Sequence, residues 1–192
     1  MAYARELNTT TNEFVAILDA AQAGAEWAWA HLYTDLAGMV TGYLQSRGAT
    51  DAEDLTSETF LQVARNIKSF EGDYESFRSW VFVIAHRRLL DSRRTIGRQP
   101  KTVSDDSHLA VVPDKQKVDD EAIGRLLTQN IEALLERLTE DQRDVLALRV
   151  IADLTVEQTA QALGKGVGAV KALQRRALAR IKRSLSEQGV PL

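Results

Sequence analysis

Residues 154–183 read LTVEQTAQALGKGVGAVKALQRRALARIKR and contain the clearest structural pattern in the chain. The spacing of Thr155 and Gln158 is that of a capping box, which predicts that a short helix over 156–163 begins there. The glycines within 164–166 predict a turn after this helix. Apolar residues then recur every three or four positions, which predicts a longer second helix. We interpret the stretch as a helix-turn-helix unit.

The second helix of this unit is expected to have an apolar face and a basic face. The apolar positions on one face are Val167, Val170, Leu173, Ala177 and Ile181, which we expect to pack on Val156, Ala160 and Leu163. The opposite face carries Lys171, Gln174, Arg175 and Leu178, with Arg176 at its flank. A major groove about 12 Å wide admits one helix, and Arg, Lys and Gln suit the base edges there. The pattern favours duplex DNA as a ligand; the alternative is an amphipathic helix whose basic residues are only solvated.

The composition limits what the rest of the chain can be. Its 192 residues allow one domain or two small ones. The absence of cysteine excludes disulfides, a thiol nucleophile and cysteine-ligated zinc, and it favours a reducing compartment, which we take to be the cytoplasm. The first residues lack a signal-peptide pattern, and the longest apolar run, 80–85, is far shorter than the roughly 20 residues that cross a bilayer. We expect a protein that is neither secreted nor membrane-spanning.

Charge is unevenly distributed in a chain whose net charge is only −3. Residues 51–58 hold four acidic residues and no basic one, and residues 105–121 hold six acidic residues against two lysines. By contrast, residues 87–101 hold six Lys or Arg against one Asp, and residues 165–183 hold seven Lys or Arg and no acid. Either basic block alone is as well explained by a solvated face as by a ligand. Two such blocks on predicted helices favour a polyanionic partner.

The whole chain is predicted to be all-α, since no window alternates with period two for long enough to form a sheet. Further capping-box spacings occur at Thr10 with Glu13, Thr50 with Glu53 and Thr139 with Gln142, and helices are expected to end at Gly24, Gly48 and Gly164. Residues 96–118 hold two of the three prolines and no helical stripe, which predicts a flexible linker. We therefore expect two small helical domains, over 10–95 and 119–186, on either side of that linker.

The first of these domains combines three features in order. An acidic helix over 51–67 is followed by a loop over 69–77 and by a helix over 78–94 that changes from apolar to basic. Aromatic side chains beside arginines suit single-stranded nucleic acid, because bases stack on rings while guanidinium groups hold phosphates. The alternative is that Trp80 and Phe82 are core residues and that the arginines are a solvated helix end.

Neither a metal site nor an enzymatic activity is expected. The carboxylates of Asp51, Glu53 and Asp54 do not share one helix face, and no histidine lies nearby to complete a metal site. The histidines at 31, 86 and 108 lie on different segments, and no nucleophile is paired with a base. We predict no cofactor and no catalytic residue.

Taken in order, these features resemble the extracytoplasmic-function (ECF) class of bacterial RNA polymerase sigma factors of the sigma-70 family. The residues that carry the resemblance are Asp51–Leu55 with Glu58–Phe60 (region 2.2 of that family), Phe77–Trp80 and Ile84–His86 (regions 2.3 and 2.4), Leu138–Arg143 (the start of region 4.1) and Val167–Lys171 (region 4.2). The resemblance covers about 25 to 185 in the family's order and spacing. It implies a sigma2-like domain over 10–95, an acidic linker over 96–118 and a sigma4-like helix-turn-helix domain over 119–186.

The resemblance also implies a function, which is to direct bacterial core RNA polymerase to specific promoters and to initiate transcription there. In that family the first domain binds the clamp helices of the largest polymerase subunit and melts the −10 promoter element. The residues implied to bind core polymerase are Asp51, Glu53, Asp54, Glu58 and Gln62. Those implied to contact the −10 element are Phe70, Asp73, Tyr74, Trp80, His86, Arg87, Arg93 and Arg94, the first three around a flipped base. Those implied to contact the −35 element are Lys171, Gln174, Arg175 and Arg176.

Further partners and one departure follow from the same resemblance. The acidic linker is implied to lie in the polymerase channel that the RNA later occupies. An anti-sigma factor, which in this family commonly holds the two domains together, is a candidate partner, and no membrane partner is expected. The family carries an arginine where this chain has Leu173 and an apolar residue where it has Gln174, so the base contacts at the −35 element stay open.

Two other functions remain as alternatives at this point. A helix-turn-helix repressor or activator that is not a polymerase subunit would use only the C-terminal domain, and it would bind duplex DNA tightly on its own, often as a two-fold dimer. A helical adaptor without a role on DNA would show no salt-dependent binding to any nucleic acid.

Overall fold

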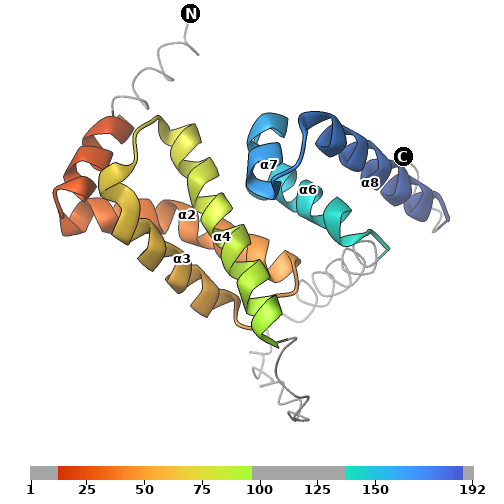
Figure 1. Ribbon diagram of the computed structural model, residues 1–192, viewed down its shortest axis with the longest axis horizontal. Helices are drawn as coiled ribbons and strands as arrows, with labels where there is room; N and C mark the ends of the chain where they lie inside the picture. The colour runs from red at the N-terminus through yellow and green to blue at the C-terminus, as the bar shows by residue number, and fades with distance from the viewer. Residues whose placement is uncertain (1–12, 97–136, 188–192) are drawn as a thin grey trace, which may run out of the picture.

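The computed structural model describes residues 13–96 and 137–187, and all regular structure within these ranges is helical. The first helical group comprises a helix over 13–22, α2 (Glu26–Ser46), α3 (Ala52–Asn66), the single 3-10 turn η1 (Ile67–Ser69) and α4 (Tyr74–Ile96). The second comprises α6 (Glu140–Val150), α7 (Val156–Leu163) and α8 (Val167–Glu187). Figure 1 shows the two groups side by side, with α4 at the boundary between them. The prediction of an all-α protein is confirmed.

Several expectations fall on residues that the structure does not describe. These are the capping box at Thr10, the linker over 96–118 except its first residue, which is the last of α4, and the part of the second predicted domain over 119–136. They stay predictions from the sequence.

The first helical group packs around long apolar side chains that recur on one face of each helix. Fully or nearly fully buried are Leu32, Leu36, Val40 and Tyr43 of α2, Phe60 and Val63 of α3, and Phe77, Val81, Phe82, Ala85 and Leu89 of α4. Helix α4 contributes the most of these residues and packs on both α2 and α3. The burial of this set is the main source of stability for the group, since apolar burial contributes about 25 cal/mol per Å².

The capping residues fix where the helices of the second group begin. In α6 and α7 both capping boxes form: the Thr139 hydroxyl accepts from the Gln142 amide at 3.4 Å, and the Thr155 hydroxyl accepts from the Gln158 amide at 3.1 Å. Each glutamine side chain returns a hydrogen bond to the backbone of its threonine. Both predicted boxes are confirmed.

The box predicted at Thr50 is wrong. Helix α3 begins one residue later than the spacing suggested, with Asp51 as its N-cap and no side-chain capping hydrogen bond. The predicted helix ends at Gly24, Gly48 and Gly164 are confirmed by backbone φ angles of 90°, 75° and 62°. Glycine reaches these left-handed values without the strain that a Cβ would bring.

In the second group α8 packs on α6 and α7 as its apolar stripe predicted. Val170 and Ala177 are buried, while Leu173 and Ile181 are partly buried against Ala160 and Leu146 respectively. The expectation fails for Val167, which is 37 % exposed. This residue is the first of α8, where the turn leaves it outside the contact between the helices.

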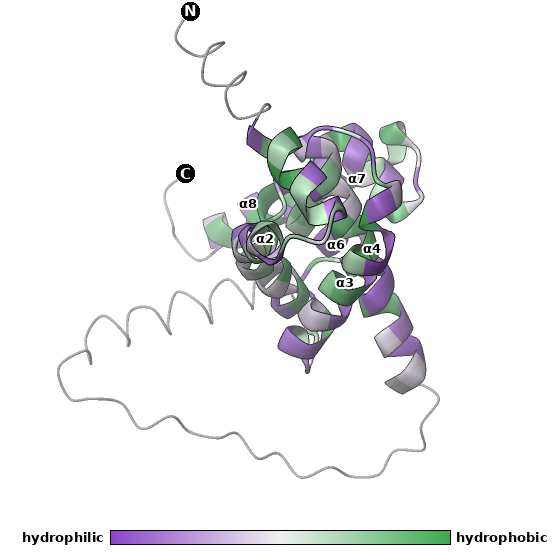
Figure 2. Ribbon diagram, turned by 90° about the vertical axis from the view of Figure 1, so that its left-hand side faces the viewer, coloured by the Kyte–Doolittle hydropathy of each residue, from purple (hydrophilic) through white to green (hydrophobic). Residues whose placement is uncertain are grey.

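The two groups share one hydrophobic core. Ala147, Leu148, Ala152, Leu154 and Ala162 of the second group belong to the same buried cluster as the core of the first. Helix α7 lies along α4, and α6 contacts α2. Each helix carries both hydrophobic and hydrophilic residues, as Figure 2 shows. Among the described helices, none is at once long and apolar enough to cross a bilayer.

Candidate nucleic-acid interface

An aromatic stack stands at the start of α4. The rings of Phe70 and Trp80 lie 5.1 Å apart at 26°, and Phe77 meets Phe70 edge-on. Phe77 and Phe82 are fully buried, so they are core residues, whereas Trp80 is half-buried. The alternative that Trp80 and Phe82 are core residues is therefore right for Phe82. It is only partly right for Trp80, because part of that side chain is exposed.

The exposed part of Trp80 lines a groove of about 540 Å³ between α3 and α4. Gln62 and Asn66 line it from α3, and Arg87 and Arg88 line it from α4. One wall is thus aromatic, and the others offer amide groups, guanidinium groups and the carboxylate of Asp91. Such a groove combines a stacking surface with cations, which is what single-stranded nucleic acid requires.

The segment before α4 is held by hydrogen bonds from the first helix and by a glycine bend. The Gln22 amide donates to the backbone oxygens of Ile67 and Phe70, at 2.9 and 2.8 Å. Gly72 has a φ of 148°, and a Cβ there would lie 3.0 Å from Cβ of Ser76, so only glycine fits this bend. These contacts position the Phe70 side chain before any ligand arrives.

Asp73 and Tyr74, which were predicted beside a flipped base, both have partners in the structure. The Asp73 carboxylate accepts from the Ser76 amide at 2.8 Å at the start of α4, and its hydrogen bonds with Ser76 lower the pKa of Asp73. The Tyr74 hydroxyl donates to Asp35 at 2.5 Å, and burial together with this bond raises the pKa of Tyr74. A base contact by either side chain would use groups that already stabilise the loop.

The basic end of α4 divides into free and paired side chains. Arg87 and Arg94 are exposed. Arg93 is half-buried, and His86 is buried, with 5 % of its surface exposed. Of these four, Arg87 alone is exposed with no charged partner among the described residues, because Arg94 pairs with Asp91 at 3.2 Å.

The residues predicted to bind polymerase are spread from the N-cap of α3, Asp51, to Gln62 in its third turn. Asp51, Glu53, Asp54 and Glu58 are exposed, and Gln62 is half-buried. Arg88 of α4 pairs with Glu58 at 3.7 Å and donates to the Gln62 side chain at 3.2 Å. Within the described residues no group of three or more His, Cys, Asp or Glu side chains could hold a metal ion.

The basic face of α8 points away from the helices that support it. Lys171, Arg175 and Arg176 are exposed and Gln174 is half-buried, while Leu178 is 51 % exposed on the same side. Leu173, where the family has an arginine, is partly buried against the second group's core. This orientation leaves the four predicted −35 residues on one accessible surface.

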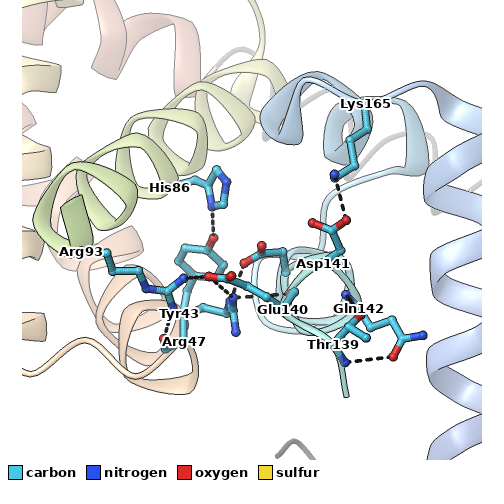
Figure 3. Close-up of polar contacts among 10 residues, drawn as sticks. Tyr43, Arg47, His86, Arg93, Thr139, Glu140, Asp141, Gln142 and Lys165 are labelled. Atoms are coloured by element: carbon cyan, nitrogen blue, oxygen red, sulfur yellow. Dashed lines mark hydrogen bonds and ion pairs between the residues drawn. The ribbon is translucent and has the colours of Figure 1, made fainter. Parts of the chain in front are cut away.

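A polar cluster that the sequence did not predict joins the two helical groups (Figure 3). Arg47 Nε, at the end of α2, donates to Asp144 Oδ1 of α6 at 2.5 Å. Beside this pair, the Tyr43 hydroxyl lies 2.7 Å from Nδ1 of His86. Burial lowers the pKa of His86, and burial raises the pKa of Tyr43. The tyrosine therefore keeps its proton, and the hydrogen bond joins its hydroxyl to a neutral imidazole.

Two further contacts hold the same boundary. Arg93 pairs with Glu140 at the start of α6, and its second nitrogen donates to the Arg47 backbone oxygen. At the other end of α4, Arg78 Nη2 donates to the Asp153 backbone oxygen at 3.0 Å. Asp153 is the only described non-glycine residue with a positive φ, 50°. Charged contacts thus close both ends of the shared apolar interface.

One signal in the sequence could have pointed to this cluster. Asp144 stands one turn before the buried Leu148, so a carboxylate occupies the apolar stripe of α6. A buried carboxylate needs a partner, and this predicts a cation from elsewhere. Nothing local identifies Arg47 as that cation, because a base at a helix end is ordinarily solvated.

Family models match both helical groups. Residues 28–99 match Sigma-70 region 2, and residues 128–181 match Sigma-70, region 4. The chain is 35 % identical over 140 residues to the ECF RNA polymerase sigma factor ShbA of Streptomyces griseus, covering 71 % of this chain and 72 % of the relative. It is 31 % identical over 173 residues to the ECF RNA polymerase sigma factor BldN of Streptomyces coelicolor, covering 89 % of this chain and 65 % of the relative's length.

Solved structures share the fold. CnrH, in complex with the cytosolic domain of CnrY, is matched with a TM-score of 0.65 at 20 % identity, over 90 % of this chain and 96 % of that one. The sigma factor RpoE from Bartonella quintana, in complex with the anti-sigma factor NepR, is matched with a TM-score of 0.59 at 20 % identity, over 82 % and 96 %.

Proposed function

This chain belongs to the ECF RNA polymerase sigma factors of the sigma-70 family, and on that premise we propose that it directs bacterial core RNA polymerase to specific promoters and initiates transcription there. The observation that carries the proposal is the presence of both sigma-70 regions in one chain, in order, each on its own helical group. A sigma factor contributes binding and positioning, while the polymerase performs the chemistry. We place its action in the cytoplasm, where that polymerase works.

The first helical group would bind polymerase and open the −10 element. The exposed carboxylates of α3 offer an acidic surface, and the groove beside Trp80 adjoins this surface at Gln62, which lines the groove. We assign polymerase binding to Asp51, Glu53, Asp54, Glu58 and Gln62. We assign the −10 element to Phe70, Asp73, Tyr74, Trp80, His86, Arg87, Arg93 and Arg94. A base that leaves the duplex needs a ring to stack on, and Trp80 with Phe70 provides one.

The second helical group would read the −35 element with α8. Lys171, Gln174, Arg175 and Arg176 project from one side of a helix that its neighbours hold rigidly. Bidentate contacts of arginine to guanine are the commonest specific contact in a major groove. Leu178 on the same face can contact a thymine methyl group.

An anti-sigma factor is a candidate regulator of this chain. The structures of CnrH and RpoE that share its fold were both solved with a bound protein, which in the RpoE complex is an anti-sigma factor. We propose that a protein of this class binds the two helical groups here. The acidic linker over 96–118 would occupy the polymerase channel until the transcript displaces it.

Binding to purified core polymerase tests the proposal. The chain should co-elute with core enzyme in gel filtration, and only the resulting complex should retain promoter DNA at physiological salt. A repressor or activator that acts alone would instead bind duplex DNA tightly without polymerase. Tight duplex binding by the chain alone, with no binding to core enzyme, would overturn the proposal in favour of that alternative.

A further inference from the structure

Two carboxylates of α6, Glu140 and Asp144, contact guanidinium groups of the first helical group. Glu140 Oε1 accepts a hydrogen bond from Arg93 and lies 4.0 Å from Nη2 of Arg47. Asp144 Oδ1 lies 2.5 Å from Nε of the same Arg47. Two guanidinium groups that converge on carboxylate oxygens have the arrangement that also binds phosphate oxygens.

The burial of these side chains shows that the site is built and not a chance surface contact. The Arg47 side chain is 1 % exposed and that of Asp144 is 7 % exposed. Charges removed from water to this extent are stable only when each is paired. Arg47 therefore needs an anion while the two helical groups are docked, and its guanidinium becomes available to a different anion when they separate.

The site continues the basic end of α4. Arg93 and His86 lie on the same helix as the exposed Arg87 and Arg94, and Arg93 also donates to the Arg47 backbone oxygen. Arg47, which comes from the end of α2, thus adds a cation beside the proposed −10 surface. Its guanidinium stands next to Arg93 because both contact Glu140.

We propose that Arg47 and Arg93 form a binding site for a phosphate group of the nucleic-acid backbone, and that Glu140 and Asp144 fill this site while the two helical groups are docked. The inference rests on the proposed function, which brings a nucleic-acid strand to α4. Docking and strand binding then compete for the same two cations. The docked chain is a closed form, and its groups separate before Arg47 contacts a phosphate.

Docking of the two helical groups and binding of a strand are expected to be close in free energy. The hydration that the charges of a buried ion pair lose offsets much of their Coulomb attraction. Exchanging its carboxylates for the phosphates of a strand therefore costs little free energy. Nucleic acid also gains from the counterions that it releases when its phosphates are neutralised. The shared apolar core, which includes Leu148 and Leu154, favours the closed form until a strand arrives.

Fluorescence anisotropy with a labelled single-stranded oligothymidylate tests the site without polymerase. The Asp144→Asn variant keeps the shape of the side chain and removes its charge, so it should bind the oligonucleotide at least about fivefold more tightly than the wild type. Asp141→Asn is the matched control, because Asp141 is on the same helix but pairs with Lys165 inside the second group. It should bind within about twofold of the wild type.

The salt dependence of binding identifies the phosphate contact. In the Asp144→Asn background, Arg47→Gln should reduce the slope of log affinity against log salt by about 0.7, the value for one phosphate on a single strand. Arg93→Gln should reduce the slope by the same amount. Because the Arg93 side chain is already 31 % exposed, this variant serves as a second test if Arg47→Gln does not fold. Equal affinity of Asp144→Asn and Asp141→Asn, or a slope that neither arginine variant changes, would overturn the proposal.

Energy transfer between dyes reports the separation itself. The chain has no cysteine, so Ala30→Cys on α2 and Ala179→Cys on α8, both exposed, give two unique labels. Oligothymidylate should lower the transfer, and unchanged transfer at saturating oligonucleotide would contradict competition. If the chain initiates transcription with polymerase but these tests fail, the proposed phosphate site at Arg47 and Arg93 is wrong and the proposed function stands.

Discussion

Arg47 at the end of α2 and Asp144 in α6 are 97 positions apart in the chain, yet they form a hydrogen-bonded ion pair with both side chains buried. Neither side chain forms a hydrogen bond or ion pair with a described residue of its own helical group. Each is desolvated by the other group, so the pair exists only while the groups are docked. The relationship makes the two groups one folded unit in the free protein.

Without this ion pair, the two helical groups should unfold in separate thermal transitions. Asp144→Ala removes the acceptor of Arg47 Nε and leaves the buried guanidinium only its longer contacts with Glu140, and the loss of one partner of a buried pair costs up to about 3–5 kcal/mol of docking free energy. We expect scanning calorimetry to show one transition for the wild type and two for this variant. Asp141→Ala, on the exposed side of α6, should keep one transition. A single transition at nearly unchanged temperature in Asp144→Ala would show that the apolar contacts alone hold the groups together.

Trp80 and the acidic residues of α3 should affect different steps. Trp80→Ala removes half of the stacking surface beside the groove, and base stacking on such a ring contributes about 1–3 kcal/mol. We expect slower promoter opening, measured with permanganate reactivity of unpaired thymines, and normal binding to core polymerase. Asp54→Ala combined with Glu58→Ala should do the reverse. Equal loss of polymerase binding in both variants would contradict this division.

The capping box of α7 should support the helix that reads the −35 element. Thr155→Ala removes the hydroxyl that accepts from the Gln158 amide, which typically costs about 1 kcal/mol. The free energy of unfolding from urea titration should fall by that amount. Thr155→Ser keeps the acceptor and should retain most of the stability. If serine and alanine were equally destabilising, packing of the threonine methyl group would be the cause instead.

Arg175 should contribute sequence preference at the −35 element. Its side chain is exposed on the basic face of α8, and the loss of a bidentate base contact costs about 1–3 kcal/mol. We expect Arg175→Ala holoenzyme to lose discrimination between promoters with intact and altered −35 elements. Lys182→Ala is a control that removes a cation further along α8. Promoter selectivity that survives Arg175→Ala would remove this residue from the base-reading set.

The stability of the protein should fall on mild acidification through His86. Burial lowers the pKa of His86 in the folded protein, whereas the unfolded chain has the ordinary value of about 6.5. The groups that face its ring are Tyr43, Arg47, Arg93, Glu140 and Asp144. Above about 6.5 both states are neutral and the full stability is present; below it the unfolded chain binds a proton first, so stability is lost as pH falls through the lowered pKa.

Unfolding midpoints measured from about pH 8 to about pH 5.5 test this expectation. His86→Gln removes the titrating group, keeps a polar side chain and should flatten the profile over that range. A wild-type profile that is flat between these values would show that the imidazole takes up its proton without cost in the folded state.

The fold could be predicted from the sequence where local signals decide it. Threonine and glutamine at capping spacing start α6 and α7, and Gly164 ends α7 with its left-handed backbone. These features depend on residues within one turn of each other. The capping box expected at Thr50 does not form, because Asp51 is the N-cap of α3, and the local spacing does not distinguish Thr50 from Asp51 as the N-cap.

The sequence predicts which residues belong to the candidate site, but it does not predict which of them contact one another. The exposed carboxylates of α3 and the basic face of α8 lie where helical periodicity puts them. The pairing of Arg47 with Asp144 and the burial of His86 depend on contacts between groups distant in sequence. Helical spacing carries no information about which cation meets a buried carboxylate across an interface.

Transcription in vitro with mapped RNA 5′ ends tests most directly that this chain is a promoter-specificity subunit. Purified chain and bacterial core polymerase would be given fragmented genomic DNA of the source organism. We predict initiation at discrete positions that share a two-block promoter motif, only when the chain is present, and loss of these starts with the Asp54→Ala, Glu58→Ala double variant. Starts that are the same with and without the chain would contradict the account.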